Sequence, residues 1–153
     1  MTVPPSRPVL GGTPDGMDEA DAELLALARD LLHTRYAVGR HEVASAFRLA
    51  DGSVVTGLHV ESSSGRASVC AETAAVSAAA IAGESVRSVV SVLRRPVGTE
   101  HLIEPCGVCA ELLVEHASEA RVWVAAGEGH RAIAVTELLP FVHVRTGRRG
   151  VVA

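Results

Sequence analysis

Hydrophobic and polar positions follow two different periods along the 153-residue chain. Leucine and alanine recur at helical spacing over 19–34, so this segment is predicted to be an amphipathic helix. Two strand-like runs, 43–50 and 54–60, flank Asp51 and Gly52, a favoured pair for a tight hairpin turn. The first half is therefore expected to form a helix followed by an antiparallel hairpin.

The second half alternates between helix-like and strand-like segments. Two segments are predicted to be helices: the alanine-rich 70–82 and 106–117. Three apolar runs are predicted to be strands: 86–93, 122–126 and 132–135. The segment 94–105 between them is expected to be a loop. Strands joined through helices favour parallel pairing, whereas the hairpin pairs antiparallel, so the order predicts an α/β fold of three layers around one mixed sheet.

Proline and glycine mark the boundaries of the domain. The first sixteen residues hold four of the seven prolines and three of the fourteen glycines, which disfavours regular structure there. We predict a flexible N-terminal tail over 1–16, one domain over 17–145 and a C-terminal tail over 146–153.

Composition and charge exclude several classes of protein. Hydrophobic residues make up 48% of the chain and charged residues 21%, which is typical of a globular domain. The net charge of −4 disfavours a nucleic acid partner. No apolar stretch approaches the roughly 18 residues of a membrane span, so no membrane partner is expected. The chain has three cysteines, a small and odd number that disfavours a disulfide framework. We expect a cytoplasmic protein with a small-molecule substrate.

The three cysteines lie where the two later helices are predicted to begin. Cys70 opens one helix, and Cys106 and Cys109 open the other. Helix N-termini stabilise thiolates, and three thiolates leave one tetrahedral position of Zn²⁺ open, as in catalytic sites. Glu72 is close enough in sequence to approach water at that position and exchange protons with it. The pattern therefore predicts a catalytic zinc site.

The motif Cys70-Ala71-Glu72, followed by Pro105-Cys106-Gly107-Val108-Cys109, resembles the signature of the cytidine deaminase superfamily. The three-cysteine form resembles the small homotetrameric cytidine deaminases and the blasticidin-S deaminases. The resemblance implies a five-stranded sheet, a homo-oligomer that is a tetramer or else a dimer, and a zinc-dependent hydrolase that acts on the C–N bond of a cyclic amidine. It implies Zn²⁺ ligation by the three cysteines, proton transfer by Glu72, and orientation of the substrate amino group by the backbone near Ala71 and Pro105.

The positions that contact the sugar in this family differ here. His59 stands where the family usually carries asparagine, and His41 stands where a phenylalanine lies near the base. Glu61, the partner of that asparagine, is present. We expect His59, Glu61 and His41 to contact the substrate. Cytidine or deoxycytidine is the expected substrate, and a blasticidin-like nucleoside or another amino-heterocycle is the alternative.

Two other interpretations of the cysteine motifs, in which the protein is not a deaminase, remain open. The altered sugar positions are compatible with a zinc-binding domain that has lost catalysis. Cys106 and Cys109 alone resemble a thiol redox pair at a helix start, although this interpretation leaves Cys70 and Glu72 without a role.

Overall fold

The computed structural model describes residues 7–143. Its helices are α1 (Glu19–Arg35), α2 (Ala71–Ala82) and α3 (Gly107–His116), with two short 3-10 helices, η1 (Gly65–Ala67) and η2 (Val135–Glu137). Its strands are β1 (Val43–Leu49), β2 (Val54–Leu58), β3 (Val86–Arg94), β4 (Glu100–Leu102), β5 (Arg121–Ala126) and β6 (Gly129–Ala134). Every predicted helix and strand is present, with ends shifted by a few residues. No helix in the described range is both long and apolar enough to cross a bilayer.

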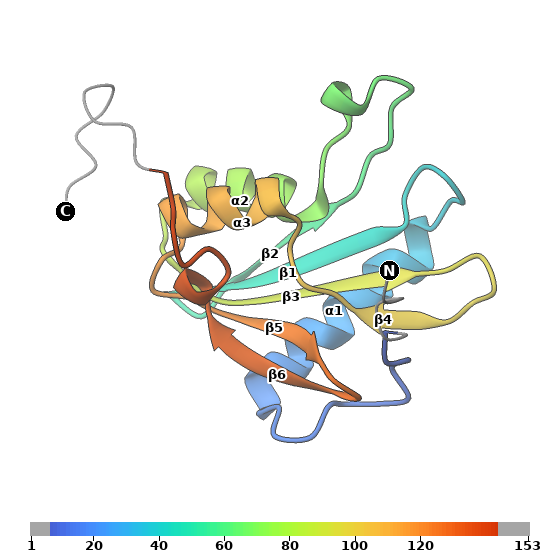
Figure 1. Cartoon of the computed structure of the whole chain (residues 1–153), viewed down its shortest axis with the longest axis horizontal. Helices are drawn as coiled ribbons and strands as arrows, with labels where there is room; N and C mark the ends of the chain where they lie inside the picture. Colours follow the sequence, from blue (N-terminus) through green and yellow to red (C-terminus); the bar gives the residue numbers. More distant parts are fainter. Residues whose placement is uncertain (1–6, 144–153) are drawn as a thin grey trace.

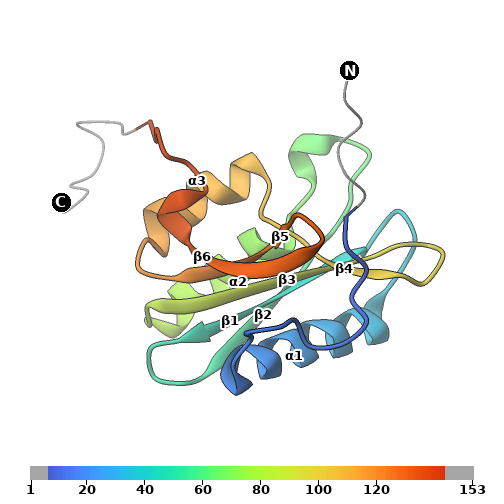
Figure 2. The same cartoon turned by 60° about the horizontal axis from the view of Figure 1, so that its bottom comes forward.

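The strands form one mixed sheet. Its order is β2-β1-β3-β5-β6, and the short β4 pairs with β3 beside that path. β1 is antiparallel to β2 and β3, β3 is parallel to β5, and β5 is antiparallel to β6. Helix α1 covers one face, whereas α2 and α3 lie side by side on the other (Figures 1 and 2). The predicted α/β fold, a three-layer α/β/α sandwich around a mixed sheet, is confirmed.

The sheet has one strand more than the five expected. The segment 94–105, predicted to be a loop, contains β4, which pairs antiparallel with the last residues of β3. β5 pairs with Ser88 and Val89 near the start of β3, whereas β4 pairs with residues 92–94 at its end. The two strands therefore pair with different parts of β3. Two of the three β4 residues, Glu100 and His101, are polar yet buried, and so the sequence lacks the alternation that signals a strand.

The central strands bury both of their faces. Phe47 and Val89 point into the core under α2 and α3. Their neighbours Ala46 and Val90 point into the core that contains Leu24 of α1. This two-sided burial explains why β3 reads as an almost continuous apolar run.

The segment before α1 contacts the sheet although it contains no helix or strand. Leu10 is 7% exposed and its N–H donates to the carbonyl oxygen of Glu100 at 2.8 Å. The Nδ1 of His101 lies 2.9 Å from the carbonyl oxygen of Pro8. Pro8 and Leu10 are therefore bonded to β4, whereas the domain boundary at residue 17 stays a prediction. Residues 1–6 and the predicted C-terminal tail, 146–153, lie outside the described residues.

Gly57 of β2 holds α2 close to the sheet. A Cβ atom at Gly57 would lie 2.0 Å from the carbonyl oxygen of Ala71 and 2.7 Å from the backbone nitrogen of Ala75. Real Cβ atoms do not approach backbone this closely, so α2 and β2 would have to separate. Because Ala71 is the first residue of α2, Gly57 also fixes the depth of the helix end that carries Cys70.

We expect Gly57→Ala to destabilise the protein by about 3 kcal/mol, the upper end of typical overpacking costs. Urea unfolding followed by circular dichroism measures this change. Gly129→Ala is the matched control, because a Cβ on β6 meets nothing within 4 Å. Equal stability of the two variants would contradict the close packing of α2 on β2.

Candidate active site

The three cysteines lie at the neighbouring N-termini of α2 and α3. Cys70 is the N-cap residue of α2, and Cys106 is the N-cap residue of α3. Cys109 follows in the first turn of α3. The Cys70 side chain forms no capping hydrogen bond with α2, and its sulfur atom faces that of Cys106. The packing of α2 beside α3 thus brings two distant sequence motifs together (Figure 1).

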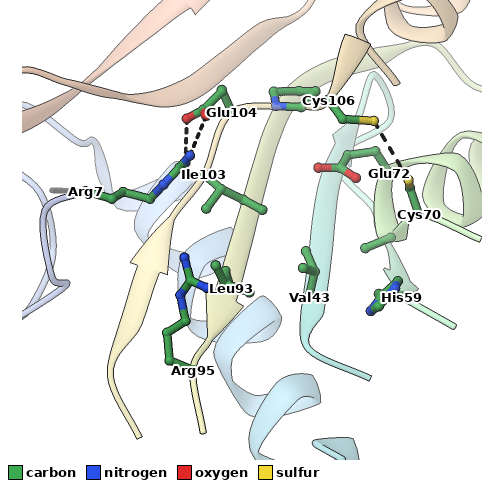
Figure 3. A pocket seen from close by; sticks show the side chains of 12 residues that line it. Arg7, Val43, His59, Cys70, Glu72, Leu93, Arg95, Ile103, Glu104 and Cys106 are labelled. Carbon is green, nitrogen blue, oxygen red and sulfur yellow. Dashed lines mark hydrogen bonds and ion pairs between the residues drawn. The ribbon is translucent and has the colours of Figure 1, made fainter. Parts of the chain in front are cut away.

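The sulfur atoms are spaced as a tetrahedral metal site requires. All three Sγ atoms lie within 4.8 Å of one another, and those of Cys70 and Cys106 are 3.9 Å apart (Figure 3). A tetrahedral zinc ion with Zn–S bonds of about 2.3 Å separates its sulfur ligands by about 3.8 Å. The three cysteines are free thiols. The donor set therefore fits Zn²⁺ in both ligand type and spacing.

Burial opposes ionisation in this cluster. It raises the pKa of Cys70, and it raises the pKa of Cys109 further with help from the nearby charge of Glu72. Burial acts on Cys106 as well, but hydrogen bonds from the Cys109 amide, from the Cys109 and Cys70 thiols and from the Val108 amide together outweigh it and lower its pKa. The hydroxyl of Thr73 lies 3.6 Å from the Cys109 sulfur. A divalent cation favours all three thiolates and reverses the balance at Cys70 and Cys109.

Glu72 is a buried carboxylate beside the sulfur cluster. It is the second residue of α2 and only 4% exposed. Its side chain points into the pocket that Cys70 and Cys106 also line (Figure 3). No other residue in 7–143 donates a hydrogen bond to it. Because this polar group has no partner in the described residues and opens into the pocket, its position indicates a ligand-facing role rather than a structural one.

The pocket has a volume of about 380 Å³, within the range of small-molecule sites. Its polar groups are separated into two ends by an apolar middle (Figure 3). The first end comprises His59, Cys70, Glu72 and Cys106, and Ala71 and Pro105, which line the pocket as well, are next to Cys70 and Cys106 in the chain. The middle comprises Val43, Leu93 and Ile103, and the second end comprises Arg7, Arg95 and Glu104.

Of the five residues predicted to contact substrate, His59, Ala71 and Pro105 line the pocket. His41 and Glu61 do not line it and instead contact His59. The Nδ1 of His41 donates to the carbonyl oxygen of His59 at 2.8 Å, and the Oε2 of Glu61 lies 2.9 Å from the Nε2 of His59. These two residues hold His59 in place.

The hydrogen bonds around His59 select one tautomer. Its Nδ1 accepts from the backbone N–H of Glu42 at 3.4 Å, so the ring proton is assigned to Nε2, which donates to Glu61. The other carboxylate oxygen of Glu61 accepts from Ser68 at 2.9 Å. A chain of hydrogen bonds therefore runs from Ser68 through Glu61 to His59 at the pocket wall.

Sequence reasoning missed the second end of the pocket. Arg7 lies in the predicted tail and forms a two-bond ion pair with Glu104, with both N–O distances 2.6 Å. The partners are 97 positions apart, so no local pattern signals the pair. Arg95, in the turn after β3, lay in a segment predicted to be a loop.

We expect Ser68→Ala to raise the pKa of Glu61. The hydrogen bond from Ser68, followed by that from His59, holds this pKa below its usual range, because donors stabilise the ionised carboxylate. Removing the stronger donor moves the pKa upward, as ¹³C NMR titration of Glu61 measures. Ser62→Ala is the control, because only the backbone amide of Ser62 favours the Glu61 carboxylate. An unchanged pKa in Ser68→Ala would contradict the hydrogen-bond chain.

Comparisons with known proteins agree with the two cysteine motifs. Residues 18–126 match the family described as the cytidine and deoxycytidylate deaminase zinc-binding region. The chain is 27% identical to blasticidin-S deaminase of Bacillus cereus over 134 residues, which cover 84% of this chain and 96% of the relative. It is 30% identical to cytidine deaminase of Halalkalibacterium halodurans over 103 residues, 66% of this chain and 76% of the relative.

The fold agrees with the same family. The crystal structure of cytidine deaminase from Mycobacterium leprae superposes with a TM-score of 0.64 and 27% identity, covering 81% of this chain and 99% of that structure. The resemblance found in the sequence is confirmed, and so are the enzyme class and the zinc cofactor. The chain belongs to the cytidine and deoxycytidylate deaminase family of zinc-binding hydrolytic enzymes.

Proposed function

We propose that this protein is a zinc-dependent deaminase that hydrolyses the C–N bond of a free cytosine nucleoside, cytidine or deoxycytidine, or of a close analogue. The observation that carries the proposal is the unpartnered carboxylate of Glu72 beside three convergent sulfur atoms, of which those of Cys70 and Cys106 line the same pocket. A proton carrier next to a metal site with an open position is the arrangement that hydrolytic deamination requires.

In this proposal, Cys70, Cys106 and Cys109 hold the metal. Zn²⁺ bound there supplies Lewis-acid chemistry that lowers the pKa of water near the reacting ring carbon. A carboxylate oxygen of Glu72 takes the proton of the attacking water and passes it to the adjacent ring nitrogen. As the C–O bond forms and the C–N bond breaks, Glu72 transfers the second proton to the amino group, which leaves as ammonia.

The other pocket residues orient the substrate. The backbone at Ala71 and Pro105 lines the same end of the pocket as Glu72, and this placement supports a role in positioning the amino group. His59 lines the pocket, with His41 and Glu61 behind it, and because both of its ring nitrogens are bonded to Glu42 and Glu61, we assign its ring a packing contact with the sugar. Glu61 and His41 then act through His59 rather than on the substrate.

A modified nucleoside of the blasticidin-S type is the second candidate substrate. The blasticidin-S deaminase of Bacillus cereus is the relative that covers 84% of this chain, more than the cytidine deaminase relative covers. Histidine at position 59 supports this candidate, because the typical sugar-binding side chain of the cytidine deaminases is replaced.

We also propose that the enzyme works in the cytoplasm as a homotetramer. Ile81 on α2 and Val108 on α3 are 86% and 74% exposed, and a second copy of the chain would cover such apolar side chains. The alanine-rich α2 allows another helix to approach closely. Light scattering after size exclusion measures the mass directly, and a monomer at micromolar concentration would contradict this part of the proposal.

Ammonia release across a substrate panel tests the proposed function. The zinc-loaded protein is incubated with cytidine, deoxycytidine, blasticidin S, an aminopurine nucleoside and a pterin that carries an amino group. Its zinc content is measured in parallel. We expect one zinc per chain and turnover of a cytosine nucleoside or of blasticidin S. One zinc per chain without any turnover would indicate a non-enzymatic zinc-binding domain, and reactive thiols without zinc would indicate a redox protein.

A further inference from the structure

The charges at the second end of the pocket do not cancel. Arg7 and Glu104 neutralise each other through their two-bond ion pair. Arg95 lines the same end, and its side chain forms no hydrogen bond or ion pair with any residue in 7–143. This end therefore carries one surplus positive charge.

The backbone fixes where Arg95 lies. Its N–H donates to the carbonyl oxygen of Thr99 at 2.9 Å, and its carbonyl oxygen accepts from Gly98 at 2.9 Å. These bonds close the tight turn between β3 and β4. Figure 3 shows Arg95 extending from the end of β3 on the side of the pocket occupied by Arg7 and Glu104, across the apolar middle from Glu72 and His59. The turn thus places the backbone of Arg95 at the pocket rim, and its exposed side chain borders the second end.

The first end of the pocket has the opposite charge. It carries the acidic side chain of Glu72 beside Cys70 and Cys106, and no arginine or lysine in 7–143 lines it. A ligand with an anionic group is repelled from this end and attracted to Arg95. An amino group that donates hydrogen bonds suits the end that carries Glu72. The two ends therefore favour a ligand with its amino group at one end and an anion at the other.

We propose that Arg95 is a specificity-determining residue that binds an anionic oxygen group, a phosphate or a carboxylate, on the sugar side of an aminopyrimidine nucleoside. The guanidinium group matches either anion through paired hydrogen bonds. Val43, Leu93 and Ile103 cover the apolar faces of the ligand between the two ends. This inference rests on the proposed function, because it assigns the substrate class of the same site.

The test compares neutral with anionic ligands. Values of kcat/KM are measured for cytidine, cytidine 5′-monophosphate and cytidine 5′-carboxylate. Calorimetry measures binding of the corresponding products, uridine, uridine 5′-monophosphate and uridine 5′-carboxylate. We expect at least one anion to be preferred over the neutral compound by about tenfold, the size expected for one charge-assisted contact. The phosphate and carboxylate arms identify which anion the pocket accepts.

Arg95→Gln removes the surplus charge and is expected to abolish the preference in both measurements. Arg131→Gln is the matched control, because Arg131 is an exposed arginine on β6 that does not line the pocket. This variant should keep the wild-type preference. Equal binding of neutral and anionic products by the wild type would overturn the inference, and so would a preference that survives in Arg95→Gln.

Failure of the inference is distinguishable from failure of the proposed function. Deamination of cytidine with no anion preference would refute the role of Arg95 and leave the deaminase intact. Tight, Arg95-dependent binding of uridine 5′-monophosphate without any deamination would refute the proposed activity and leave the anion site intact.

Discussion

Glu72→Gln is expected to retain zinc and to lower the deamination rate at least 100-fold. The variant keeps the size and shape of the side chain but cannot carry a proton from water to the ring nitrogen. General acid–base groups contribute about 10²–10⁴-fold to rates, and Glu72 is the carboxylate that lines the sulfur end of the pocket. Steady-state ammonia release and metal analysis on the same preparation measure both properties.

Stability separates this catalytic role from a structural one. A carboxylate that is 4% exposed and receives no hydrogen bond from the described residues does not stabilise the fold. Glu72→Gln should therefore not lower the free energy of unfolding of the metal-free protein. Glu111→Gln is the control, because Glu111 is exposed on α3 and does not line the pocket. Wild-type turnover by Glu72→Gln would refute the proposed mechanism.

Cys109→Ser is expected to lose zinc and, with it, activity. Serine keeps the size of the side chain but is a much poorer zinc ligand than a thiolate. Loss of an outer hydrogen-bond partner already costs about 10–100-fold in metal affinity, so loss of a ligand should cost more. Competition with a chromogenic chelator measures the affinity. The melting temperature should then no longer rise on addition of zinc.

Thr73→Val gives a graded comparison at the same sulfur atom. It removes the hydroxyl that lies 3.6 Å from the Cys109 sulfur but keeps all three cysteines. Its zinc affinity should fall by at most about 10–100-fold, which is the usual cost of losing a hydrogen-bond partner of a metal ligand. Wild-type zinc affinity in Cys109→Ser would contradict the three-cysteine site.

The elements that carry the cysteines were predictable because local rules determine them. Asp51 and Gly52 mark the hairpin, and Gly52 takes the positive φ of 86° that glycine tolerates. Gly83, with φ of 73°, ends α2 where the sequence predicted. The cysteine motifs fall at the two helix starts, so their convergence needed only the packing of α2 beside α3.

The strand β4 was not predictable from its own residues. Its Glu100 is buried because Arg29 and Arg94 approach its carboxylate at 2.6 Å and 3.2 Å, and His33 contacts it as well. Two of these partners come from α1, far away in sequence. Because Glu100 meets these partners only in the folded protein, the polar sequence around it is typical of a loop.

The arrangement of residues around the pocket also depends on tertiary contacts that the sequence does not reveal. The sequence predicted that His59, Glu61 and His41 contact the substrate, and His59 does line the pocket. It did not predict that Glu61 and His41 lie behind His59 instead of lining the pocket. The second end of the pocket is formed by Arg7, Arg95 and Glu104, and no spacing rule connects these three residues.

Isotope labelling tests the central claim, hydrolytic deamination at this site, most directly. The zinc-loaded enzyme is incubated in H₂¹⁸O with the best substrate of the panel, and ammonia and product are quantified by enzymatic assay and mass spectrometry. We expect one ammonia per product molecule and one ¹⁸O atom in the carbonyl group that replaces the amino group on the ring, with both lost in Glu72→Gln. Product without solvent ¹⁸O, or no ammonia from any substrate at one zinc per chain, would contradict this claim.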